Sequence, residues 1–69
     1  MATISSTDTI FATVKQRGSM VANIRISGVE TMAHIMREVR TQLGAVSGLL
    51  TIDLRNQSQG WNTRQSIML

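Results

Sequence analysis

The sequence predicts an α+β fold, a single ββαββ domain in which one amphipathic helix packs on one face of a four-stranded sheet. Three observations support this prediction. Apolar side chains alternate with polar ones in four short segments, which is the period of a half-buried strand. Between the second and third segments the apolar spacing changes to 3.6 residues, the period of a helix. The chain has 69 residues and no cysteine, so one small core must hold the fold without disulfides.

The N-terminal part of the chain is expected to contain a loose segment followed by two strands. Residues 1–8 are small and polar and have little periodicity, so we predict a loose lead-in before a single domain at residues 9–69. Residues 9–16 and 20–27 are rich in alternating β-branched side chains. This pattern predicts two strands joined as a hairpin.

The parity of the side chains predicts how this hairpin closes. A two-residue turn at Arg17 and Gly18 would place apolar side chains of one strand opposite polar ones of the other. We therefore favour a three-residue loop at residues 16–18 with Gly18 in the left-handed conformation. That loop pairs Val14 with Met20, and it gathers one apolar face: Ile10, Ala12, Val14, Met20, Ala22, Ile24 and Ile26.

The helix is predicted over residues 28–43. Ser27 and Glu30 have the spacing of a capping box, in which each side chain accepts from the other residue's backbone N–H. Gly44 follows the last apolar residue, where a left-handed backbone ends many helices. The helical spacing collects one apolar stripe: Val29, Met32, Ala33, Ile35, Met36, Val39 and Leu43.

The C-terminal part predicts a second hairpin. Residues 49–56 alternate with Leu50, Ile52 and Leu54 inward, and residues 57–60 form a four-residue turn. This turn pairs those three side chains with Thr63, Gln65 and Ile67, and it places Asp53 opposite Arg64 on the other face. The last strand, residues 61–69, is the most polar, so we expect it to be an edge strand or to carry a bulge.

Two orders of the strands fit these elements. In the order 1-2-3-4 the helix connects adjacent parallel strands 2 and 3 by a right-handed crossover. In the order 2-1-4-3, strands 1 and 4 pair in parallel at the centre. The opening hairpin followed by a helix resembles the start of β-grasp domains, which have this second order. The polar fourth strand makes a poor centre, so we favour 1-2-3-4.

The residues that carry chemistry do not gather in any recognisable motif. His34 is the only histidine, and with no cysteine a metal site would lack ligands. The four carboxylates, Asp8, Glu30, Glu38 and Asp53, each have a structural explanation, and none forms an evident acid and base couple. We therefore expect no catalytic residue, no metal, no cofactor, no small-molecule substrate and no enzymatic activity.

The sheet face opposite the helix is the more informative surface. The chain carries seven basic and four acidic residues, a net charge of +3, and four of the basic side chains are predicted on this face. Phe11 lies among them and could stack on a base. The face would then contact a nucleic acid, and its predicted contact residues are Lys15, Arg25, Arg55 and Arg64.

Self-association is the function that the sequence favours over nucleic-acid binding. After one small core is filled, apolar side chains remain without a place. Monomeric sheets protect their edges with lysine or proline, and this chain has one lysine and no proline. We expect a homo-oligomer joined through the open sheet face or the edge strands, with contact residues Phe11, Val21, Leu49 and Met68.

The compartment follows from what the sequence lacks. Its first residues do not have the basic and then apolar pattern of a secretory signal. The longest uncharged run, residues 41–52, is too short to cross a bilayer, so we expect no membrane partner. We predict a cytoplasmic protein. The sequence does not exclude that the protein belongs to a virion or is encoded by a mobile element.

Overall fold

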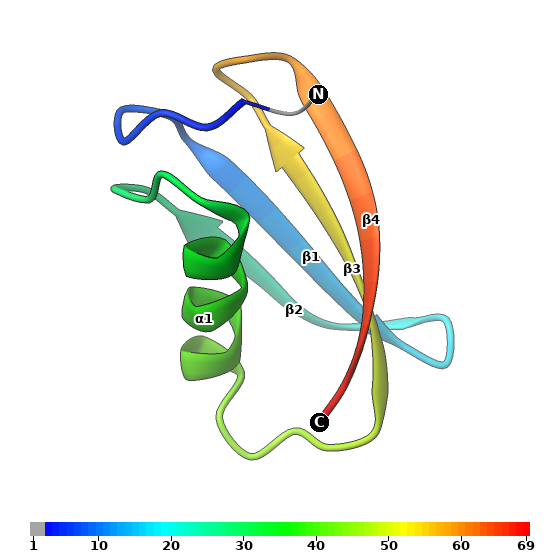
Figure 1. Cartoon of the computed structure of the whole chain (residues 1–69). Coiled ribbons are helices and arrows are strands. Elements are labelled where there is room, and N and C mark those ends of the chain that lie inside the picture. The colour runs from blue at the N-terminus through cyan, green and yellow to red at the C-terminus, as the bar shows by residue number, and fades with distance from the viewer. Residues whose placement is uncertain (1–2) are drawn as a thin grey trace.

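The computed structural model describes residues 3–69 and confirms the predicted fold class (Figure 1). Four antiparallel strands form one sheet and a single helix follows the second strand. Each predicted strand is present to within one residue at either end. The elements are β1 Ile10–Gln16, β2 Ser19–Ile26, α1 Met32–Leu43, β3 Leu49–Asn56 and β4 Trp61–Met68.

The strands lie in the order β2-β1-β3-β4, so both predicted orders are wrong. After β2 the chain passes through α1 and enters β3, which lies on the far side of β1. β2 and β3 are therefore parallel to each other, with β1 antiparallel between them. This arrangement places β1 and β3, the strands with the most buried residues, at the centre of the sheet and the polar strand β4 at an edge (Figure 1). The favoured order, 1-2-3-4, had the crossover connect adjacent strands, whereas in the structure β1 lies between β2 and β3.

The first hairpin closes with the two-residue turn that the sequence analysis rejected. Gln16 pairs with Ser19, and both Arg17 and Gly18 have positive φ, at 54° and 79°. Two such residues form the mirror-image turn that matches the twist of antiparallel strands. Only the left-handed conformation of Gly18 was predicted correctly.

A β-bulge resolves the parity problem that had argued against this turn. The register shifts between Val14 and Lys15, so that Val14 pairs with Ala22 while Lys15 pairs with Met20. Val21 is the extra residue. The bulge returns Ile24 and Ile26 to the core, but it leaves Met20 outside it, with 64% of its surface exposed. The prediction that Met20 faces inward is therefore wrong.

The second hairpin has the predicted register throughout. Leu54 pairs with Thr63, Ile52 with Gln65 and Leu50 with Ile67. Asn56 begins the turn, because its side-chain Oδ1 accepts from the Gln59 N–H at 2.9 Å and its carbonyl accepts from the Gly60 N–H at 2.9 Å. β4 is an edge strand without a bulge, as one of the two predicted alternatives required.

The helix begins four residues later than predicted. Its N-cap is Thr31, whose hydroxyl accepts from the His34 N–H at 3.1 Å. Gly28 has a φ of +73°, which no helix accommodates, so the proposed capping box of Ser27 and Glu30 does not form. The predicted end is confirmed, because the Gly44 N–H donates to the Arg40 carbonyl. Within residues 3–69 no helix has the length and apolar character needed to cross a membrane.

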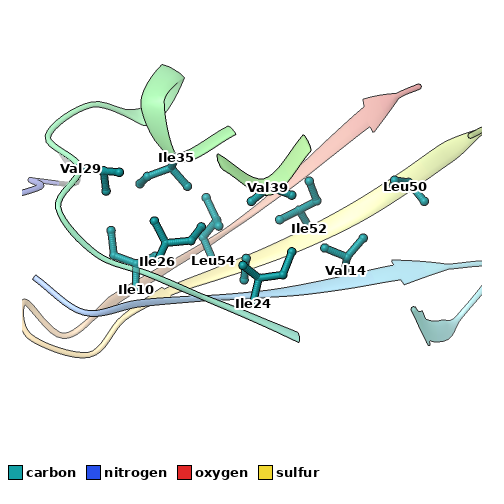
Figure 2. Close-up of a cluster of buried hydrophobic side chains, with 11 residues drawn as sticks. Ile10, Val14, Ile24, Ile26, Val29, Ile35, Val39, Leu50, Ile52 and Leu54 are labelled. Carbon is teal, nitrogen blue, oxygen red and sulfur yellow. The ribbon is translucent and has the colours of Figure 1, made fainter. Parts of the chain in front are cut away.

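The core lies between α1 and the sheet (Figure 2). Ile35 and Val39 point from the helix toward the sheet, and both are fully buried. The helix packs mainly against β2, at the side of the sheet away from β4 (Figure 1). The helix-side residues of β4 are consequently only half-buried: Trp61, Thr63, Gln65 and Ile67.

The N-terminal segment is tied to the domain rather than loose from residue 3 onward. Asp8 is 4% exposed and accepts hydrogen bonds at 2.9 Å from the Asn56 side chain and from the Ser5 backbone. Ile4 packs against the core, and the Trp61 indole donates to the Thr3 carbonyl at 2.7 Å. Residues 1 and 2 of the predicted lead-in lie outside the described residues.

Candidate functional site

The candidate site is the open face, which we define as the side of the sheet that α1 leaves bare. Its residues alternate with the core residues along each strand, so the core pattern fixes which side chains belong to it. A shallow concavity of about 870 Å³ lies on this face and is lined by residues of all four strands. Phe11, Thr13, Asp53 and Arg64 are among the side chains that line it.

Phe11 belongs to a row of four side chains that runs across all four strands. It pairs with Arg25 on β2 and with Arg55 on β3, and Arg55 in turn pairs with Asn62 on β4. Side chains at directly paired positions lie roughly 5 Å apart at Cβ. Phe11 is half-buried between two exposed arginines. We call this row and the neighbouring Arg64 the cationic half of the open face.

The acidic residue of the open face belongs to an ion pair. Arg64 Nε donates to Asp53 Oδ1 at 2.8 Å, which confirms the predicted cross-strand pair. The hydrogen bond and charge of Arg64, with the charge of Lys15, hold the pKa of Asp53 below its usual value, and Asp53 raises the pKa of Arg64. Among residues 3–69, no carboxylate lies within ion-pair distance of Arg25 or Arg55.

The exposed apolar side chains lie toward the other end of the open face, in two pairs separated by Lys15 and Thr51. Leu49 and Met68 pair directly across β3 and β4 and are 59% and 69% exposed. Met20 and Val21 lie at the bulge of β2, opposite Lys15, and Val21 is 44% exposed. We call these four residues the apolar end.

The structure divides the predicted contact residues differently from the sequence analysis. Leu49, Met68 and Val21 lie at the apolar end, whereas Phe11 lies among the arginines of the cationic half. Lys15 lies nearer the apolar end, since it pairs with Met20 and Thr51. Met20 was missed because no sequence signal marked the bulge that turns it outward. Leu69, 37% exposed, was also missed, since its position at the end of β4 gave no signal.

The two edges of the sheet differ in how they are protected. β2 carries the bulge at Val21, which interrupts the regular edge. β4 runs for eight residues without a bulge, a proline or a lysine. Its charged residue, Arg64, donates to Asp53 on β3, so its side chain, 72% exposed, lies over the neighbouring strand. Within the described part of the chain, no strand pairs with the outer side of β4.

The groups that carry chemistry are dispersed over the described residues. His34 Nε2 lies 3.8 Å from Glu38 Oε1, one helical turn away, and both side chains are 40% exposed. Glu30 precedes the helix, Asp8 is buried near the second turn, and Asp53 is paired with Arg64. From Thr3 to Leu69, no three histidine, cysteine or carboxylate side chains are grouped so that they could hold a metal ion.

Comparisons with protein-family models, with curated proteins and with solved structures find no match for this chain.

Proposed function

We propose that this protein is a small structural or interaction subunit, without catalytic activity, that acts by self-association into a homo-oligomer. The observation that carries the proposal is the outer edge of β4, which is regular, eight residues long and unpaired in residues 3–69. Such an edge offers a row of backbone donors and acceptors to another strand. A second copy of the chain is the simplest partner that presents a matching row.

The edge lacks the features that usually prevent such pairing. Charged side chains protect an edge when they extend past it into solvent. Arg64 is the charge on β4, and its hydrogen bond to Asp53 directs it over β3 instead. The contrast with β2, which has a bulge, indicates that β4 is the edge available for pairing.

Exposed apolar side chains beside this edge support the same proposal. Met68 lies on β4 itself, and Leu49 is its direct partner on β3. Both are more than half exposed. Burying a leucine or methionine side chain stabilises an interface by about 1.5–3 kcal/mol when the burial is complete. Association at this edge would remove part of that surface from water.

Met68→Glu tests the proposal at its own surface. We expect the wild-type chain to sediment above its monomer mass of 7.6 kDa, and the variant to need at least about a tenfold higher concentration to do so. Thr41→Glu is the matched control, because it adds the same charge at an exposed helix position. A wild-type chain that stays monomeric at millimolar concentration would rule the proposal out.

Nucleic-acid binding is the second candidate, and the row of Arg25, Phe11 and Arg55 is the observation that favours it. Two exposed cations beside an aromatic ring combine attraction to phosphate with a surface for base stacking. The only acidic side chain of the open face is occupied by Arg64. Proteins that read single-stranded RNA on a sheet usually present two or three aromatic residues, whereas this face presents one.

A salt titration with single-stranded DNA and RNA tests this candidate. If the row contacts phosphates, Arg55→Gln should lower the slope of log K against log salt by roughly 0.7. Arg37→Gln removes an exposed arginine from the helix, on the other side of the sheet, and should leave the slope unchanged. Equal effects of the two variants, or no binding at low salt, would exclude the row as a nucleic-acid site.

A further inference from the structure

The backbone hydrogen bonds of β3 and β4 determine which groups the outer edge of β4 offers. Gly48 and Leu69 exchange both of their backbone hydrogen bonds, at 2.9 and 3.0 Å. In an antiparallel ladder such bonded pairs alternate with non-bonded pairs. The odd-numbered residues of β4 therefore direct their N–H and C=O groups toward β3. The outer edge displays those of the even-numbered residues: Asn62, Arg64, Ser66 and Met68.

Two requirements limit how a second copy can pair antiparallel with this edge. Side chains that lie opposite each other in the two copies must project from the same face of the joined sheet. The outward N–H and C=O groups of one copy must also lie opposite the outward groups of the other, so that they can form hydrogen bonds. A symmetric pairing meets both requirements only when its two-fold axis lies at a residue of β4, so that this residue faces the same residue of the second copy. An axis midway between two residues would set displayed groups against undisplayed ones. The residue at the axis therefore determines the register.

The candidate registers differ in charge and in overlap. An axis at Arg64 places the arginines of the two copies directly opposite each other, which is unfavourable. An axis at Thr63 leaves Met68 beyond the end of the partner strand and sets Ser66 against the turn glycine Gly60. An axis at Gln65 pairs every displayed residue, Arg64 with Ser66 and Asn62 with Met68, and puts no like charges directly opposite.

We infer that two copies pair through β4, antiparallel and with Gln65 opposite Gln65, to form one continuous sheet. This inference rests on the proposed self-association and specifies its geometry. Both helices then lie on one side of the joined sheet and both open faces on the other. On the helix side, Trp61 lies opposite Leu69 of the second copy and Thr63 opposite its Ile67.

The packing of α1 supports this seam, by which we mean the junction between the two β4 strands. The helix packs mainly against β2, so it leaves the helix-side residues of β4 half-buried. Trp61 and Ile67 already contact the core of their own copy. Pairing at Gln65 brings the remaining exposed parts of these side chains next to the equivalent strand of the second copy. The seam thus adds apolar burial to the backbone hydrogen bonds.

A single cysteine at the axis tests the register. The chain has no cysteine, so Gln65→Cys introduces one unambiguous thiol per copy. Directly opposite residues in a non-bonded pair lie about 4.5 Å apart at Cα, within the range that a disulfide spans. We expect a covalent dimer in glutathione redox buffer. Thr63→Cys is the control, because its two copies would lie about 14 Å apart and should not link.

A proline at the edge tests the seam without relying on cross-linking. Ser66→Pro removes an outward N–H and no hydrogen bond to β3, so the variant should fold but dissociate. Ser66→Ala keeps the N–H and should remain associated. Asn23→Pro removes an outward N–H from β2 and should also remain associated.

The outcomes separate this inference from the proposed function. If wild type is associated but Gln65→Cys links no better than Thr63→Cys, the register is wrong. If Ser66→Pro also remains associated, β4 is not the seam, and self-association itself still holds through another surface. A monomeric wild type would remove both the proposed function and this inference. Linking at Gln65 together with loss of association in Ser66→Pro would support the geometry.

Discussion

At the scale of single residues, the buried pair of Asp8 and Asn56 joins the N-terminal segment to the second hairpin. Asn56 is fully buried, and its amide both donates to Asp8 and accepts from the Gln59 backbone. All buried side-chain polar atoms in the described residues have a hydrogen-bond partner. The pair therefore places two distant segments of the chain in a fixed relation without leaving a buried group unpaired.

Removing the Asn56 amide should lower the free energy of unfolding. Asn56→Ala removes one hydrogen bond from the buried Asp8 carboxylate, which keeps the Ser5 N–H, and leaves the Gln59 N–H without its partner. A buried group that loses its hydrogen bond costs about 1–3 kcal/mol. We expect the free energy of unfolding in urea to fall by an amount in this range. Asn62→Ala, at an exposed position on β4, should change it by less than about 0.5 kcal/mol. Equal losses in the two variants would contradict the described network.

The same pair predicts how stability depends on pH. Hydrogen bonds from the Asn56 side chain and the Ser5 backbone hold the pKa of Asp8 below 3.8. The unfolded chain then binds a proton more readily than the folded one, so this contribution is complete above pH 3.8 and is lost as pH falls through the lower folded pKa. Asp8→Asn should flatten the stability curve in that acid range.

A carboxyl titration by NMR measures this effect directly. We expect the Asp8 carboxyl of the folded chain to titrate below 3.8 and that of an unfolded peptide of the same sequence to titrate near 3.8. Asp53 also has a lowered pKa, so part of the acid sensitivity should remain in Asp8→Asn. A folded-state pKa of Asp8 above the peptide value would show that the hydrogen bonds to its carboxylate are absent.

At the scale of elements, the start of α1 shows how local sequence signals compete. The sequence predicts a cap at Ser27 with Glu30, whereas the structure has its N-cap at Thr31. The predicted capping box fails because Gly28 adopts a left-handed φ after β2 and ends any helix that would include it. Tertiary context therefore decided the choice, since Val29 is buried in the core before the helix begins.

Two alanine substitutions distinguish the caps. Thr31→Ala should lower the free energy of unfolding by about 1 kcal/mol, because it removes the oxygen that accepts from the His34 N–H. Ser27→Ala should leave it nearly unchanged, since Ser27 is exposed and lies before the helix. Chemical denaturation of both variants measures the difference. The opposite ranking would place the cap at Ser27.

The first hairpin carries a strained residue that can be relieved. Arg17 has a φ of +54°, a conformation that costs most side chains roughly 1 kcal/mol but that asparagine tolerates. Arg17→Asn should therefore raise the free energy of unfolding by about 0.5–1 kcal/mol. Arg17→Gln removes the same charge without the favourable backbone preference and should give no such gain. A stabilisation shared by both variants would assign the effect to charge.

The two hairpins show where the sequence suffices and where it does not. The second hairpin was predictable in full register, because Leu50, Ile52 and Leu54 alternate without interruption and the turn length preserves parity. In the first hairpin, the predicted inward and outward faces of β1 were correct, but the predicted pairing with β2 was two residues out of register: Val14 pairs with Ala22 and not with Met20. No residue type marks Val21 as an inserted position, so neither the bulge nor the exposure of Met20 followed from the sequence.

At the scale of the whole molecule, the strand order decides which surfaces remain free. The sequence predicted β4 as polar and suited to an edge, but it did not predict that β1 would lie between β2 and β3. A long crossover is compatible with several orders, and only packing selects among them. The order found leaves α1 over β2 and the outer side of β4 open.

The candidate site was predictable residue by residue but not in its arrangement. The open-face positions of Phe11, Arg55 and Arg64 followed from strand parity. Their grouping did not, because it depends on which strands are neighbours. Phe11 lies between Arg25 and Arg55 only because β1 separates β2 from β3, so the strand order created the cationic half. Leu49 and Met68 pair within the second hairpin, and the strand order places that pair beside the free edge.

The proposed self-association can be tested by the solution mass of the wild-type protein across a range of concentrations. Sedimentation equilibrium gives this mass without assuming a shape. We expect a mass that rises from the monomer value of 7.6 kDa to twice that value as concentration increases. A mass that remains at 7.6 kDa up to millimolar concentration would contradict it.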